Sequence, residues 1–122
     1  MRELSARESV DRVALVGFSM GAIGLWDIIA KHRSLFSCAL PIAGDLEPGS
    51  VRGLDDLPIW AFHGERDEWV PNAGTRAAMA RLTRAGRYTE LPGAGHTIAD
   101  EVLARDDVQD WLNAPRPARP PA

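Results

Sequence analysis

Val13-Ala14-Leu15-Val16-Gly17-Phe18-Ser19-Met20-Gly21 is the stretch that decides the fold of this chain. Its first four residues are small or branched and apolar, a pattern that predicts a β-strand buried on both faces. The strand runs into Gly-x-Ser-x-Gly, and an apolar segment compatible with an α-helix follows over residues 22–32. The stretch therefore predicts a strand, a tight turn and a helix in that order.

That order is the setting in which this pentapeptide forms a nucleophile elbow, a strained turn that points the serine hydroxyl away from the sheet. Gly17 and Gly21 lack a Cβ atom, so the strand and the helix can approach closely around the bend. The helix N-terminus would also place N–H groups and a partial positive charge near Ser19. The competing interpretation is a flexible turn that happens to contain a serine.

Strand and helix patterns alternate along the rest of the chain. We expect further strands over 37–43, 59–63 and 87–91, and helices over 20–32, 72–86 and 97–113. This alternation implies an α/β fold, a parallel sheet of about four strands with flanking helices joined by right-handed crossovers. Pro41 argues against a central position for the 37–43 strand.

Several finer expectations accompany this reading. Residues 1–12 are interpreted as a helix end and a turn, and one helical turn is expected near 51–57. Asn72 is a plausible N-cap and Gly86 a helix stop, while Thr97 with Asp100 fits a capping box. The side chains expected to face the sheet are Ile23, Trp26, Ile29 and Ala30 in the first helix, Met79 and Leu82 in the second, and Val102, Leu103, Val108 and Trp111 in the last.

Length and composition narrow the range of possible domain sizes, partners and cellular locations. With 122 residues the chain is expected to form one domain at most, and a net charge of −3 gives no electrostatic reason to expect nucleic acid or an anionic membrane as partner. Cys38 is the single cysteine and lies in an apolar run, so it is expected to be a buried thiol, with no internal disulfide. No signal peptide or membrane span is visible, which makes the cytoplasm the default location.

Three polar residues each follow the carboxyl end of an expected strand. Ser19 follows the first, Asp67 lies in the segment after residues 59–63, and His96 closes the loop after residues 87–91. In a parallel sheet these ends share one edge, where open α/β sheets place their sites. A serine needs a base to take its proton and an acid to orient that base. These residues therefore form a candidate nucleophile, acid and base.

Each role has rivals. His32 and His63 compete as the base, although a helix C-terminus explains the first and a structural role suits the second. Asp45 competes as the acid because it also follows a strand. Glu65 and Glu68 are expected to face solvent. A metal site made of His63, Asp67 and His96 is conceivable, but the glycine-flanked serine makes it unnecessary, and no metal or other cofactor is predicted.

The motifs together resemble the C-terminal half of an α/β-hydrolase, most closely the predicted-peptidase, carboxylesterase/phospholipase and dienelactone-hydrolase-like esterases. The likeness covers nearly all of residues 10–112 and rests on Gly17-Phe18-Ser19-Met20-Gly21, His63-Gly64-Glu65-Arg66-Asp67 with Val70-Pro71, and Gly93-Ala94-Gly95-His96. Trp26-Asp27, Pro58-Ile59-Trp60 and Tyr88-Thr89-Glu90 resemble the predicted-peptidase branch. The resemblance implies a serine esterase with Ser19 as nucleophile, Asp67 as acid, His96 as base and the Met20 N–H as an oxyanion-hole donor.

The chain also departs from that family, which usually has several strands and two helices before the elbow strand. Met1 stands only about a dozen residues ahead of it. We therefore expect an α/β-hydrolase domain over 1–114 that lacks the N-terminal strands, and a disordered Pro/Arg-rich tail over 115–122. The elbow strand would then be an apolar edge strand, which a second copy or a complementing chain could cover. A smaller departure is Ala22, where the family more often has glycine.

Two functions follow from these observations. The first is hydrolysis of small carboxylic esters through an acyl-enzyme. The second is a non-catalytic interaction domain that retains the triad residues without a working pocket. The acyl and alcohol groups of a substrate depend on pocket walls that these motifs do not specify.

Overall fold

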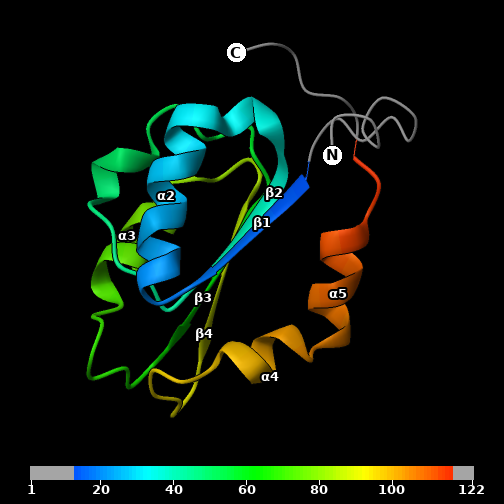
Figure 1. Cartoon of the computed structure of the whole chain (residues 1–122). Helices are drawn as coiled ribbons and strands as arrows, with labels where there is room; N and C mark the ends of the chain where they lie inside the picture. Colours follow the sequence, from blue (N-terminus) through cyan, green and yellow to red (C-terminus); the bar gives the residue numbers. More distant parts are fainter. Residues whose placement is uncertain (1–12, 117–122) are drawn as a thin grey trace.

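The computed structural model describes residues 13–116 (Figure 1), so the expected N-terminal helix end and most of the expected tail lie outside the described residues. A parallel four-stranded sheet in the order β1-β2-β3-β4 forms the centre. Its strands are β1 (Val13–Phe18), β2 (Phe36–Ile42), β3 (Ile59–Gly64) and β4 (Gly86–Leu91). The helices are α2 (Met20–His32), α3 (Ala73–Arg81), α4 (Ala99–Leu103) and α5 (Asp106–Asn113), with short 3₁₀ turns η1 (Arg33–Leu35) and η2 (Pro48–Val51). The expected α/β fold with a parallel sheet is confirmed.

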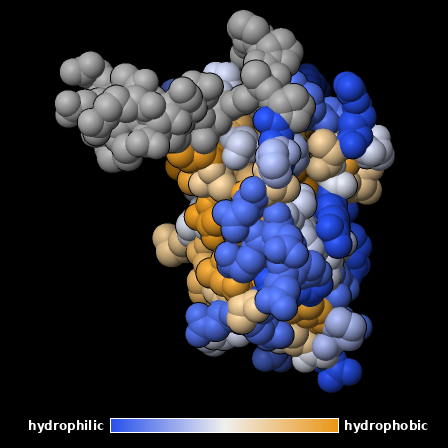
Figure 2. Space-filling view, turned by 90° about the vertical axis from the view of Figure 1, so that its right-hand side faces the viewer, coloured by the Kyte–Doolittle hydropathy of each residue, from blue (hydrophilic) through white to orange (hydrophobic). Residues whose placement is uncertain are grey.

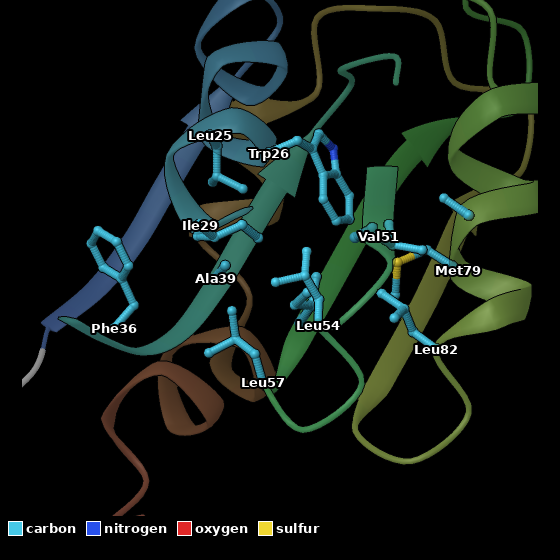
Figure 3. Close-up of a cluster of buried hydrophobic side chains, with 13 residues drawn as sticks. Leu25, Trp26, Ile29, Phe36, Ala39, Val51, Leu54, Leu57, Met79 and Leu82 are labelled. Carbon is cyan, nitrogen blue, oxygen red and sulfur yellow. The ribbon is translucent and has the colours of Figure 1, made fainter. Parts of the chain in front are cut away.

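Two hydrophobic clusters cover the two faces of the sheet. Helices α2 and α3 lie on one face, and α4 and α5 on the other (Figure 1). Strand β3 serves both, because Ile59 and Ala61 belong to the α2/α3 cluster while Trp60 and Phe62 belong to the α4/α5 cluster. Figure 3 shows the first cluster, in which Trp26 of α2 packs with aliphatic side chains from the sheet, the η2 region and α3.

Strand β1 is an edge strand of the described sheet and is not buried on both faces, which corrects the first expectation for it. It pairs with β2 alone, and Val13 and Val16 remain 52% and 42% exposed. The apolar run predicted the strand correctly, but burial of its faces depends on neighbours that this part of the chain does not supply. Viewed from the side that carries α5, hydrophobic surface lies beside a hydrophilic stripe (Figure 2).

Strand β2 occupies a central position despite Pro41. The N–H groups of Ala39 and Ala43 donate to the carbonyls of Pro58 and Phe62 on the β3 side. Backbone N–H groups of successive residues in a strand point to opposite sides, so position 41 faces β3 like positions 39 and 43. Pro41 has no N–H group, and one hydrogen bond between β2 and β3 is therefore missing there. Strong pairing with β1 on the other edge, from Val13 to Phe18, keeps the strand in place. Pro41 therefore interrupts one ladder without ending the strand.

Helix α2 has the expected bounds, but its inner face is rotated. Trp26 and Ile29 are buried as expected, whereas Ile23 and Ala30 are exposed. Ala22 and Leu25 complete the buried set instead. The helical repeat in the sequence fits either face, and the crossing of α2 over β1 and β2 selects one.

The remaining helices differ from expectation at their ends. Helix α3 ends at Arg81, and Gly86 begins β4 instead of stopping the helix. Asn72 makes no side-chain cap; its amide donates to the carbonyls of Gly64 and Glu65. Met79 and Leu82 face inward as expected.

The expected last helix is two helices, α4 and α5, separated at residues 104–105, and Thr97 does not cap the first, whose N-cap residue is Ile98. Val102 and Val108 are buried and Trp111 is half-buried, as expected of an inner face, whereas Leu103 is 37% exposed. The expected turn near 51–57 lies earlier, at η2. Among residues 13–116, no helix is both long and apolar enough to cross a bilayer.

Candidate active site

Ser19 stands at the bend between β1 and α2 in a strained backbone conformation. Its φ of 56° and ψ of −115° are rarely adopted by a residue with a side chain. Its N–H donates to the carbonyl of Ile42 at 2.9 Å, and its own carbonyl accepts from the N–H groups of Ala22 and Ile23. The turn is therefore held by the neighbouring strand on one side and by the helix on the other.

Gly17 makes this close approach possible, as expected, whereas a Cβ on Gly21 would have no neighbour within 4 Å, so the expected role of Gly21 is wrong. A Cβ on Gly17 would lie 2.5 Å from the carbonyl oxygen of Gly21. Just after β2, a Cβ on Gly44 would lie 2.4 Å from the Cβ of Ala22. The methyl group of Ala22, where the family more often has glycine, therefore occupies space that Gly44 leaves free.

Ser19, His96 and Asp67 form a continuous chain of hydrogen bonds. Ser19 Oγ lies 2.9 Å from His96 Nε2, and His96 Nδ1 lies 2.7 Å from Asp67 Oδ2. With an ionised Asp67 as acceptor, His96 donates its Nδ1–H to the carboxylate and leaves Nε2 free to accept the serine proton. The arrangement can raise the nucleophilicity of a serine and store the proton that it loses.

The Asp67 carboxylate is buried, and both of its oxygens accept hydrogen bonds. Its Oδ1 accepts from the backbone N–H groups of Trp69 and Val70, each at 2.9 Å, and its side chain is 0% exposed. Burial raises the pKa of Asp67, but the hydrogen bonds from Val70, His96 and Trp69 together outweigh it and lower the pKa. Asp67 is therefore an anion at neutral pH.

The loops that carry Asp67 and His96 are tied to each other. Arg66 N–H donates to the carbonyl of Ala94 at 2.8 Å, and the Glu65 carboxylate accepts from the N–H of Gly93 at 2.7 Å. A Cβ on Gly64 would lie only 2.0 Å from the carbonyl oxygen of Gly95. Glycine at the end of β3 thus allows the loop after β4 to bring His96 onto Asp67.

The rival candidates lie elsewhere or serve a different purpose. His32 is exposed in the last turn of α2, and the carboxylate of Asp45 accepts from the N–H of the adjacent Leu46. His63 is fully buried; its Nε2 is 2.9 Å from the carbonyl oxygen of Val70 and 3.3 Å from Asp67 Oδ2. His63 therefore braces the loop that presents Asp67. Within residues 13–116, no group of His, Cys, Asp and Glu side chains is arranged to hold a metal ion.

Met20 is the first residue of α2, so its N–H is one of the helix N–H groups without an intrahelical acceptor. It adjoins Ser19, and its side chain is largely exposed. A negatively charged oxygen beside Ser19 Oγ would meet this N–H and the positive end of the helix.

Two aromatic rings beside His96 were not anticipated from the sequence. The rings of Phe18 and Trp69 each lie 5.2 Å from the imidazole, centroid to centroid. Phe18 directly precedes Ser19, and Trp69 follows Asp67 by two residues. A large apolar residue in the charged segment Glu65-Arg66-Asp67-Glu68 was the available signal for Trp69.

Comparison with known proteins gives a consistent result. A model of the Phospholipase/Carboxylesterase family, within the α/β-hydrolases, matches residues 2–114. Esterase LipQ of Mycobacterium tuberculosis is 34% identical over 91 residues, which are 66% of this chain and 20% of LipQ. NocK of Nocardia uniformis subsp. tsuyamanensis is 27% identical over 103 residues, which are 83% of this chain and 30% of NocK.

A thermostable esterase of known crystal structure superimposes with a TM-score of 0.78 at 30% identity, over 84% of this chain and 30% of that one. The chain thus spans less than a third of the length of these relatives. By its family match and its fold, the chain belongs to the phospholipase/carboxylesterase family of α/β-hydrolases.

Proposed function

We propose that this chain carries the serine-hydrolase machinery of a carboxylic ester hydrolase, with Ser19 as nucleophile, His96 as base and Asp67 as acid. The observation that carries the proposal is the hydrogen-bond chain of 2.9 Å and 2.7 Å that joins the three side chains. The strained turn at Ser19 supports it, because strained backbone conformations cluster at active sites, where the surrounding structure holds them in place.

In the first half of the reaction, His96 Nε2 takes the proton of Ser19 Oγ as the oxygen attacks the ester carbonyl carbon. The carbonyl oxygen becomes an anion, to which the Met20 N–H donates. His96, now an imidazolium stabilised by Asp67, gives its proton to the departing alkoxide. The alcohol leaves, and Ser19 carries the acyl group.

In the second half, water takes the place of the alcohol. His96 removes a proton from the water as it attacks the acyl carbon, and the proton then passes to Ser19 Oγ as the carboxylic acid departs. A second oxyanion donor ordinarily comes from a loop after an earlier strand, and losing one donor costs about 10²–10³ in rate. We propose that this donor comes from sequence that precedes β1 or from a partner chain.

Labelling of the purified chain with a fluorophosphonate, read by intact and peptide mass spectrometry, tests the proposal. The probe should modify Ser19 and no other serine, and Ser19→Ala should abolish labelling. His96→Ala should slow labelling by at least about a thousandfold, because the nucleophile loses its base. His32→Ala is the matched control: it removes an exposed histidine at the far end of α2 and should label at the wild-type rate.

An unlabelled Ser19 in a chain with a folded circular dichroism spectrum would contradict the proposal. The exposed edge of β1 favours a second function in that case, namely an interaction domain. Labelling that is equally fast in His96→Ala would also contradict it, since it would mean that Ser19 reacts without His96.

A further inference from the structure

Trp69 is placed beside the catalytic histidine yet left open to solvent. It is 75% exposed, whereas Trp26 and Trp60 are 4% and 0% exposed. Tryptophan contributes a large apolar area and is on average highly buried, so an open ring next to a reactive group is a candidate contact surface for a ligand. Its one ring contact among the described residues is with His96.

The position of Trp69 is set by the same hydrogen bonds that hold the acid. Its backbone N–H donates to Asp67 Oδ1 at 2.9 Å, which fixes the main chain at the root of the ring. Phe18 contributes a second, partly exposed ring at the same 5.2 Å from His96, from the end of β1. The end of β1 and the loop after β3 thus each place an aromatic ring beside one imidazole.

The chemistry of the proposed reaction decides which part of an ester would lie there. His96 Nε2 must reach the oxygen of the departing alcohol to protonate it. The body of the alcohol is attached to that oxygen, so it lies on the His96 side of Ser19, where Phe18 and Trp69 are the aromatic rings that neighbour the imidazole. The acyl group is bonded to the carbonyl carbon and extends from Ser19 in another direction.

We infer that Trp69, with Phe18, forms an apolar subsite for the alcohol portion of the substrate, so that the chain prefers esters of aromatic or bulky apolar alcohols over esters of small alcohols. This inference rests on the proposed function. A flat indole face suits a planar or branched apolar group, and burying it on that face removes apolar area of both partners from water.

The test compares methyl butyrate with benzyl butyrate, whose alcohols are similarly basic leaving groups. Both esters form the same butyryl-enzyme, so a difference between them arises before the alcohol departs. Trp69→Ala should lower the benzyl-to-methyl ratio of kcat/KM about tenfold or more, and Trp69→Phe should retain most of it. Leu35→Ala, which removes a 54% exposed apolar side chain in η1, just before the start of β2, should leave the ratio unchanged.

A second measurement needs no turnover. Benzyl alcohol should slow fluorophosphonate labelling of Ser19 at concentrations at which methanol does not, and Trp69→Ala should remove this protection. An equal loss of kcat/KM for both esters would overturn the inference, because it would assign Trp69 to shielding His96 from water. Normal labelling of Ser19 without protection by benzyl alcohol would also overturn it and leave the esterase proposal intact, whereas absent labelling would refute the esterase proposal itself.

Discussion

At the scale of single residues, the site depends on a carboxylate that is buried and kept ionised. Asp67 receives two backbone N–H groups on one oxygen and His96 on the other. The folded chain thereby holds the pKa of Asp67 below its ordinary value, whereas the unfolded chain would show a pKa of about 3.9. A carboxyl group with a lowered folded pKa stabilises the fold above its unfolded pKa, and this contribution is lost as the pH falls through the folded value.

Asp67→Asn should therefore destabilise the chain most at neutral pH, and the gap to wild type should narrow below about pH 4. Urea unfolding at pH 7 and at pH 3.5 measures both gaps. Asp27→Asn is the control: its side chain is 68% exposed and paired with Lys31 on the surface of α2, so the free energy of unfolding should change by less than about 1 kcal/mol at either pH. A gap for Asp67→Asn that widens toward acid would contradict the assigned shift.

At the scale of elements, the contact between β1 and α2 requires glycine at one position and only tolerates it at another. A Cβ on Gly17 would meet the backbone of Gly21, which cannot yield without moving the turn at Ser19. Gly24, in the middle of α2, has open space where its Cβ would be. The two glycines therefore predict opposite effects of the same substitution.

Gly17→Ala should lower the free energy of unfolding by about 1–3 kcal/mol, because the added methyl overpacks the bend. Gly24→Ala should raise it by about 0.5–1 kcal/mol, because alanine loses less backbone entropy in a helix. Urea unfolding followed by circular dichroism checks both. If Gly17→Ala proved neutral, the close approach at the bend would be refuted.

At the scale of the whole molecule, β1 is an edge strand whose outer edge pairs with no strand of the described sheet. Its outward side chains are apolar, and the described part of the chain pairs only one of its edges. Apolar edges of this kind pair with other chains. We expect the isolated chain to self-associate through β1.

Val16→Lys should reduce that association, since a charged side chain on an exposed position of an edge strand disfavours pairing. Sedimentation velocity over a range of concentrations should show a smaller fraction of dimers and larger species than wild type. Leu35→Lys, at an exposed apolar position in η1 outside β1, should behave like wild type. Equal effects of both variants would assign the association to general hydrophobicity.

Much of the fold and of the candidate site was predictable from the sequence. Each strand was located, and the order Ser19, Asp67, His96 after three strand ends pointed to one edge of a parallel sheet. These predictions worked because strand and helix periodicity and tight-turn chemistry are local properties, readable within a few residues. The meeting of three distant side chains then followed from topology.

The errors share one physical cause. The expected burial of β1 on both faces, the expected inner face of α2 and the expected edge position of the strand that contains Pro41 were wrong because each depends on what packs beside the element, which no local pattern contains. The same holds for Phe18 and Trp69, which approach His96 from the end of β1 and from the loop after β3. The expected edge position of β1 is confirmed. The sequence by itself determined where the strands and most helices form and which residues make up the candidate site. Only the tertiary structure decided which faces are covered and what surrounds the histidine, because burial and contact are properties of neighbours distant in the chain.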